Sequence, residues 1–174
     1  LLENDSKILN DYERFILIAS AYLHDIGMQS PIHAGLIKKT DYTWAEKKII
    51  RDNHNESSAR MINDSLSTGS DLDFGLRICT DLAFFISEVS RYHRSLDLND
   101  LKKGSLAGKQ IQLPLLAALL RLADELDADF QRVNMEILKL SDIPSESKYH
   151  WWAHHYLQSI LIEEGPKIKL RAAT

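Results

Sequence analysis

The chain has 174 residues and a formal net charge of -4, and 44% of its residues are hydrophobic. This length supports one substantial hydrophobic core but hardly two independent ones. With only seven Gly and four Pro, the composition excludes a disordered or fibrous protein and favours an ordered, helix-rich one. The negative net charge does not indicate nucleic acid as a partner, although a local basic patch can still bind it.

Cysteine content and apolar runs indicate the cellular setting. Cys79 is the only cysteine, so no internal disulfide can form, which favours a cytoplasmic protein. The longest apolar stretch, 113–120, is far shorter than the roughly 20 residues that span a bilayer, so we expect no membrane association. The sequence opens on Leu1 without Met or leader, and we expect it to be part of a longer multidomain chain.

The first half of the chain predicts three helices. Apolar residues at helical spacing predict one long helix over 6–26 that ends at Gly27, followed by a loop over 28–42. A capping box at Thr43 predicts a short helix to about Asp52. The next residue, an Asn, is suited to cap a third helix that stops in a polar run of Ser, Gly and Asp.

The next part of the chain predicts two longer core helices. Apolar spacing predicts a helix over 72–93 and, after a loop over 96–112, another over 115–129. Pro114 opens the second of these helices at its first position. A further short helix is expected over 133–138.

The C-terminal part changes character. The Trp- and His-rich segment 149–156 leads into an apolar stretch and a Glu-Glu-Gly-Pro turn, then into alternating residues around Ile168, which predicts a helical turn and a β-hairpin. We therefore predict a mainly α fold. It comprises a helical bundle over 1–140 and a small C-terminal β-hairpin extension over 141–174, packed on the same domain.

His24 and Asp25 are the first candidate site residues. Each lies on a predicted helix face that small or apolar residues otherwise fill. An ionised carboxylate is costly to bury there unless it is paired or binds a metal. Both side chains can converge where the chain turns before Gly27. A pair of metal ligands and a His–Asp hydrogen bond that closes the helix both fit this dipeptide alone.

Two further histidines extend the candidate site. His54 lies at a predicted helix start, where the helix dipole keeps an imidazole neutral and leaves a lone pair for a metal. The alternative for His54 is an exposed terminal histidine. His93 shares a helix face with Ile86 and Val89, so we expect it to point toward the core. It is either a ligand or a core histidine that a backbone carbonyl satisfies.

Asp124 is the last candidate ligand. It follows Leu120 on a strongly apolar helix face, so we expect the carboxylate to point inward. An ion pair with Arg121, three residues earlier, is the alternative to a metal. Inward His and carboxylate side chains on separate helices are typical of metal sites in helical bundles.

The stretches AYLHDIGM, HNESSARMI, ISEVSRYH and ALLRLADELDADFQRV resemble the HD superfamily of metal-dependent phosphohydrolases, over roughly residues 15–133. The resemblance implies an all-helical HD domain that holds one or two divalent ions. It implies metal ligands at His24, Asp25 and Asp124, with His54 and His93 completing a two-metal site or contacting phosphate. The superfamily's first His lies one helix earlier, so we expect it upstream of Leu1 or absent.

Two further resemblances concern the C-terminal part and the substrate. KYHWWAHH and the predicted hairpin are similar to the extension of HD domains attached to Hsp90-like ATPases. RLADELDADFQRV is similar to the C-terminal HD-type domain of exopolyphosphatases, and both resemblances imply a phosphate-bearing ligand. Met28 stands where some two-metal members have a Lys, which argues against the cyclic-dinucleotide phosphodiesterase branch.

The sequence therefore predicts hydrolysis of a phosphoester or phosphoanhydride, above all in a nucleotide, with Asp25 as the catalytic residue that bridges two ions. Mixed His and carboxylate ligands suit Mn, Fe, Co, Ni or Zn better than Mg. Arg94 and Arg132 are candidate phosphate contacts, with surface salt bridges as their alternative.

Two other functions stay open at this point. One is a non-catalytic HD domain that binds nucleotide or metal and regulates an attached ATPase domain. The other is a structural helical module whose inward His and Asp side chains satisfy one another.

Overall fold

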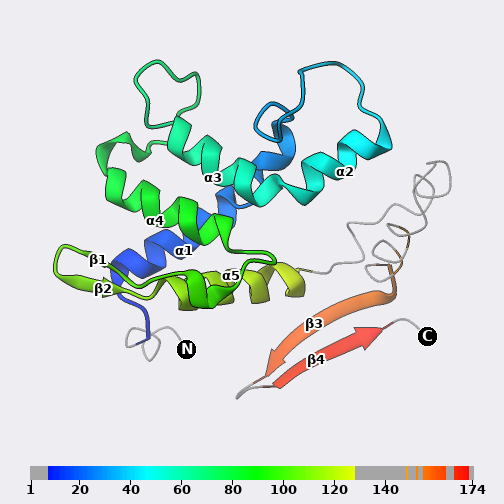
Figure 1. Ribbon diagram of the computed structural model, residues 1–174. Coiled ribbons are helices and arrows are strands. Elements are labelled where there is room, and N and C mark those ends of the chain that lie inside the picture. The colour runs from blue at the N-terminus through cyan, green and yellow to red at the C-terminus, as the bar shows by residue number, and fades with distance from the viewer. Residues whose placement is uncertain (1–7, 128–147, 149–151, 153–154, 164–166, 173–174) are drawn as a thin grey trace. The chain divides into compact units, whose positions relative to one another are not determined.

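The structure is a computed structural model that describes residues 8–127, 148, 152, 155–163 and 167–172 (Figure 1). The chain divides into two units, Leu1–Arg121 and Leu122–Thr174. The described residues are mainly helical, with a two-stranded antiparallel hairpin near the C-terminus, which confirms the predicted fold class. No described helix is long and apolar enough to cross a membrane. The predicted boundary between 140 and 141 lies outside the described residues.

Helix α1 (Asp11–Leu23) begins at a capping box. The Asn10 side chain accepts two backbone N–H groups of the first turn, and the Glu13 carboxylate accepts the N–H of Asn10 at 2.9 Å. The predicted helix over 6–26 is therefore too long at both ends. The cap fixes its start at Asp11, and its end falls at Leu23, where the chain turns into a short 3-10 helix, η2 (Ile26–Gln29).

Helix α2 (Trp44–Asp52) confirms the predicted capping box and both predicted bounds. The Thr43 hydroxyl accepts the N–H of Glu46, and the Glu46 carboxylate accepts the N–H of Thr43. The segment between η2 and α2 has no further helix or strand, as predicted.

Helix α3 (His54–Asp64) begins directly after α2 and stops in the predicted polar run. Asn53 stands at its N-cap position, but its side chain does not cap α3. The Asn53 amide instead donates to the carbonyl of Ile49 at 2.9 Å and closes the end of α2. The predicted position of the cap at Asn53 is confirmed, but the prediction that its side chain caps α3 is wrong.

Helix α4 (Thr80–Arg91) starts later than the predicted helix over 72–93. Gly75 has φ of 71° and turns the chain into a separate 3-10 helix, η3 (Leu76–Ile78). A left-handed residue cannot continue an α-helix, so apolar spacing alone extended the prediction too far. Another 3-10 helix, η4 (Leu98–Asp100), follows α4.

A short antiparallel hairpin, β1 (Gly104–Leu106) and β2 (Lys109–Ile111), lies within the segment predicted as a loop. Its two-residue turn is Ala107-Gly108, with φ values of 48° and 77°. Positive φ at both turn residues is the geometry that matches the twist of paired strands. Strands of three residues leave too little alternation for a sequence pattern to reveal them.

Helix α5 (Leu113–Leu126) matches the predicted helix with Pro114 in its first turn, and it ends three residues earlier than expected. The predicted helix over 133–138 lies outside the described residues. In the second unit, β3 (Leu157–Glu163) and β4 (Lys167–Ala172) pair antiparallel and confirm the predicted C-terminal hairpin.

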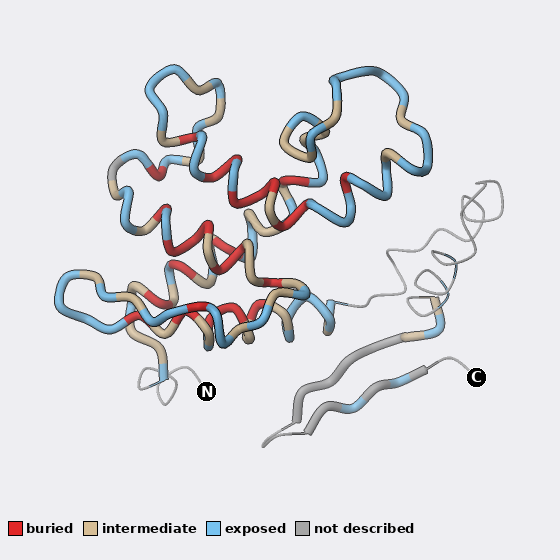
Figure 2. The backbone as a smooth tube through the Cα atoms, in the orientation of Figure 1, coloured by how far each residue is buried: buried red, intermediate tan, exposed pale blue. Residues whose placement is uncertain are grey.

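The core of the first unit lies between α1, α3, α4 and α5, whose facing sides carry the buried residues (Figure 2). Its aliphatic residues with at most 2% exposure are Ile16, Ile62, Ala83, Ile86, Val89, Ile111, Leu116, Ala117 and Leu120. Burial of this apolar area is the main stabilising contribution to the unit. The packed core fixes the end of α1 against the start of α3 and the end of α4, where the candidate site lies.

Candidate metal centre

His24 and Asp25 stand at the junction between α1 and η2. The N–H of His24 donates to the carbonyl of Ser20 at 2.8 Å, so His24 still continues the helix. Asp25, with φ of -105°, leaves it. The two neighbouring side chains therefore turn toward each other, with 3.6 Å between His24 Nε2 and Asp25 Oδ2. This is the convergence expected at the helix end.

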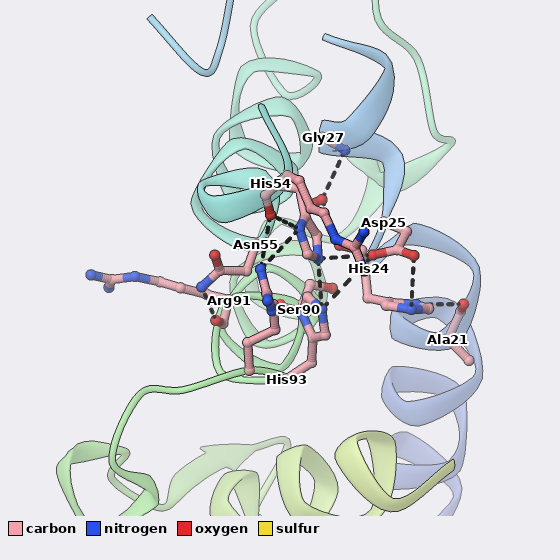
Figure 3. Close-up of polar contacts among 12 residues, drawn as sticks. Ala21, His24, Asp25, Gly27, His54, Asn55, Ser90, Arg91 and His93 are labelled. Atoms are coloured by element: carbon pink, nitrogen blue, oxygen red, sulfur yellow. Dashed lines mark hydrogen bonds and ion pairs between the residues drawn. The ribbon is translucent and has the colours of Figure 1, made fainter. Parts of the chain in front are cut away.

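His54 and His93 come to the same point from two other helices (Figure 3). His54 is the first residue of α3, and His93 lies two residues past the end of α4. The Nε2 atoms of His54 and His93 lie 3.0 Å and 3.8 Å from Asp25 Oδ1, and 3.0 Å from each other. The structure thus brings together four of the predicted site residues.

The histidine side chains of the cluster are shielded from solvent, whereas the Asp25 carboxylate is exposed. The exposed fraction of the side chain is 0% for His93, 8% for His54 and 16% for His24, but 54% for Asp25. The expectation that His93 points inward is confirmed, and the alternative of an exposed His54 is wrong. A ligand from solvent can therefore reach the cluster through Asp25.

All three ring orientations are fixed in the same way. Each Nδ1 lies at hydrogen-bond distance from the backbone carbonyl three residues earlier: His24 to Ala21 at 2.9 Å, His54 to Arg51 at 2.6 Å and His93 to Ser90 at 2.5 Å. A carbonyl oxygen only accepts hydrogen bonds, so each Nδ1 must carry the proton. Each neutral ring therefore presents the lone pair of Nε2 to the cluster.

This arrangement fits a divalent cation. Two Nε2 lone pairs at 3.0 Å repel each other unless a proton or a cation lies between them. Without a cation, a proton on His54 Nε2 would have to serve both Asp25 and His93. With a cation, all ligand atoms keep their preferred state, and backbone carbonyls that hold the Nδ1–H groups are usual around metal-bound histidines. The ligand atoms of Asp25, His54 and His93 all lie within 4.8 Å of one another.

The pKa values of His93 and Asp25 favour the protonation states that metal ligands need. Burial disfavours the imidazolium and lowers the pKa of His93 to about 4, although its hydrogen bond to Ser90 acts in the opposite direction. In the metal-free protein, where a proton on His54 Nε2 can serve Asp25, the hydrogen bond from His54 is the main cause that lowers the pKa of the Asp25 carboxyl, against the effect of its partial burial. At neutral pH His93 is therefore neutral and Asp25 is ionised, as metal ligands must be.

Gly27 allows the backbone of η2 to pass against the first turn of α3. A Cβ atom at this position would lie 2.2 Å from the carbonyl oxygen of His54 and 2.6 Å from the backbone nitrogen of Ser58. Any side chain would therefore push η2 away from α3. We predicted Gly27 as a helix stop, and the structure gives it a different role, because it sets how closely Asp25 approaches His54.

Two buried polar residues hold the cluster together, and sequence reasoning missed both. The Ser58 hydroxyl donates to the carbonyl of His24 at 2.6 Å and accepts the N–H of Gly27 at 2.9 Å, so it fixes the backbone on both sides of Asp25. The Asn55 amide donates to the carbonyl of Arg91 at 2.9 Å and joins α3 to α4. The available signal was their position on the same short helix as His54, with Asn55 directly after it and Ser58 one turn later.

The remaining predicted site residues lie at the edge of the cluster or beyond it. Arg94 donates through Nη1 to the carbonyl of Arg51 at 2.8 Å and lies 3.5 Å from His54 Nδ1. Arg132 lies outside the described residues. The phosphate contacts of both arginines stay predictions.

Asp124 lies in the last turn of α5, within the second unit. We expected an inward-pointing carboxylate, and the residue is exposed. Arg121, its alternative partner, donates to the backbone carbonyls of Tyr92 and Leu96. The metal-binding role of Asp124 stays a prediction.

A His-Asp pair at the end of α1, joined by a histidine at the start of α3 and another just past the end of α4, is the arrangement expected of an HD-type domain. The chain belongs to the HD-CE family, whose family model matches residues 1–172. This match covers nearly the whole chain and confirms the resemblance to the HD superfamily in an extended form. Neither a curated protein nor a solved structure gives a significant match.

We expect Ser58→Ala to lower the free energy of unfolding by about 1 to 3 kcal/mol, because it leaves a buried carbonyl and a buried N–H without their partner. Ser57→Ala is the matched control. Ser57 is equally buried, but its hydroxyl has no hydrogen-bond partner among the described residues, so we expect a change within about 0.5 kcal/mol. Urea unfolding followed by circular dichroism measures both, and equal losses would contradict the role of Ser58.

In metal-free buffer we expect stability to fall as the pH drops from about 6.5 to 4. In this window the unfolded chain binds a proton at His93, whose ordinary pKa is 6.5, while the native state, with a pKa of about 4, does not. The loss attributable to His93 is on the order of 2 to 3 kcal/mol. Urea unfolding of His93→Gln should show a shallower decline over the same window, and an unchanged decline would contradict a buried neutral His93.

Proposed function

We propose that this chain is a metal-dependent phosphohydrolase that acts on a phosphoester or phosphoanhydride, above all in a nucleotide. The observation that carries the proposal is the common orientation of the three histidines. Their Nδ1 atoms are held by backbone carbonyls, and their Nε2 atoms face the Asp25 carboxylate. Such a set of imidazole and carboxylate ligands suits Mn, Fe, Co, Ni or Zn better than Mg.

Asp25 is the residue that we assign as the bridge between two ions. Its Oδ1 is directed to His54 and His93, and its Oδ2 lies nearest to His24. One ion would be held by Asp25, His54 and His93. The HD resemblance implies Asp124 as a further metal ligand.

A divalent ion held by these residues would polarise a phosphoryl oxygen and lower the pKa of an attacking water. The residues of the chain supply the rest. Buried His93 stays neutral near pH 7 and does not compete for protons, and the exposed side of Asp25 leaves room for a phosphate group. We assign Arg94, which the carbonyl of Arg51 holds beside His54, to a phosphate oxygen, because its planar guanidinium suits phosphate.

A second candidate function is regulation without catalysis. The C-terminal segment is similar to the extension of HD domains attached to Hsp90-like ATPases, and the chain belongs to a family of extended HD domains. In that case the same cluster binds metal or nucleotide and transmits this state to an attached ATPase domain. In the structural alternative, a proton on His54 Nε2 satisfies the cluster, and no metal binds.

The test is turnover by the metal-loaded protein. With added Mn we expect hydrolysis of at least one member of a panel of nucleotides, cyclic nucleotides, polyphosphate and single-stranded nucleic acid. Combined His24→Ala and Asp25→Ala substitutions should lower the rate by on the order of 100-fold or more, because both metal ligands and the bridge are lost. His33→Ala is the control, since His33 pairs with Asp64 outside the cluster.

The outcomes separate the three functions. Activity that survives the combined His24→Ala and Asp25→Ala substitutions would contradict the assignment of the cluster as the active site. Bound metal without turnover of any substrate favours the regulatory domain. Absence of both bound transition metal and a metal-dependent rise in melting temperature favours the structural module.

A further inference from the structure

One side of α2 presents an indole and three cations to solvent. Trp44, Lys47, Lys48 and Arg51 follow one another at helical spacing along this side, which we call the α2 face. All four residues are exposed, and Trp44 keeps 47% of its surface accessible. The helix is anchored on another side by Ile50, its one buried residue. The α2 face is therefore not used for packing of the first unit.

The α2 face keeps a positive charge, because one acidic residue of α2 pairs with Lys39 and the other neutralises only Lys48. Glu46 points away from this face and holds Lys39 through two contacts of 2.7 Å. Asp52 pairs with Lys48 at 2.7 Å. Within the described part of the chain, Lys47 and Arg51 have no carboxylate partner, and the Lys47 ammonium lies 5.1 Å from the centre of the Trp44 ring. Two cations and one ring are thus available to an anionic, aromatic ligand.

The α2 face ends close to the candidate metal centre. Helix α2 runs directly into α3, whose first residue is His54 (Figure 1). The carbonyl of Arg51 accepts hydrogen bonds from both His54 Nδ1 and Arg94 Nη1. The cations Lys47 and Arg51 of the α2 face are thus followed by Arg94, which contacts the backbone of Arg51 and lies beside the cluster. From Trp44 to Arg51 this line spans about 10 Å along the helix axis.

We propose that the α2 face binds single-stranded nucleic acid and directs it to the metal centre. This proposal rests on the proposed phosphohydrolase function and names its substrate as an oligonucleotide rather than a mononucleotide. A nucleic-acid strand supplies both features that the face recognises. Its phosphates match Lys47, Arg51 and Arg94, and an unpaired base stacks on Trp44. A polyphosphate would use the cations but not the indole.

The experiment measures binding of a fluorescent single-stranded oligonucleotide of about ten nucleotides by anisotropy, in EDTA and about 50 mM salt. We expect combined Lys47→Gln and Arg51→Gln substitutions to weaken binding about 10-fold or more. They should also reduce the slope of log affinity against log salt by about 1.4, because two phosphate contacts are lost. Trp44→Ala should weaken binding at least about 5-fold without changing this slope, and Trp44→Phe should largely restore it.

The matched control is the pair Lys102→Gln and Lys103→Gln, which removes the same charge from exposed residues outside the α2 face. It should leave binding nearly unchanged, and circular dichroism should show that all variants keep their helix content. No saturable binding, or an equal loss in this control, would overturn the proposal. So would unchanged binding of Trp44→Ala together with equal competition by inorganic polyphosphate.

The binding assay contains no metal, so it separates this proposal from the proposed function. Oligonucleotide binding without any hydrolysis would contradict the phosphohydrolase function and support the α2 face as a nucleic-acid surface. Hydrolysis of mononucleotides without any oligonucleotide binding would contradict nucleic-acid binding by the α2 face and support the phosphohydrolase function.

Discussion

The hydrogen bonds from three histidine Nδ1–H groups to backbone carbonyls are the interactions on which the candidate site depends. His24, His54 and His93 each bind the carbonyl three residues earlier, at 2.5 to 2.9 Å. Each bond fixes both the tautomer and the direction of the ring. Because the three rings lie at two helix ends and one helix start, their Nε2 atoms meet at a single point beside Asp25. A carboxylate and three lone pairs at that point create a strong local preference for a cation.

This constraint also explains features that otherwise have no connection. Gly27 lacks a side chain because η2 must approach α3 closely enough for Asp25 to reach His54. Ser58 holds the backbone on both sides of Asp25 and so helps to fix the position of the carboxylate. The apolar core holds the helix ends that carry the cluster in place. The exposed Asp25 carboxylate lets a ligand from solvent reach the cluster.

The sequence predicted much of this arrangement, and the misses have physical reasons. Capping chemistry is local, so the start of α2 at Thr43 followed from the residues themselves. The start of α4 did not, because apolar spacing continues through the left-handed Gly75. The gathering of His24, Asp25, His54 and His93 was predicted from inward-facing positions and from the HD resemblance. Asn55 and Ser58 escaped prediction because their partners lie more than 30 residues away, and the metal binding of the cluster stays a prediction.

We propose that three Nε2 atoms face a divalent cation while three Nδ1 atoms stay protonated. Long-range nitrogen–proton correlation NMR of the nitrogen-labelled protein, recorded in EDTA and after addition of Zn²⁺, tests it most directly. We predict Nδ1–H at His24, His54 and His93 in the zinc-loaded protein, and we expect the Nε2 resonances of His54 and His93 to move when zinc is added. An Nε2–H tautomer at these histidines in the presence of zinc, or spectra that zinc leaves unchanged, would contradict it.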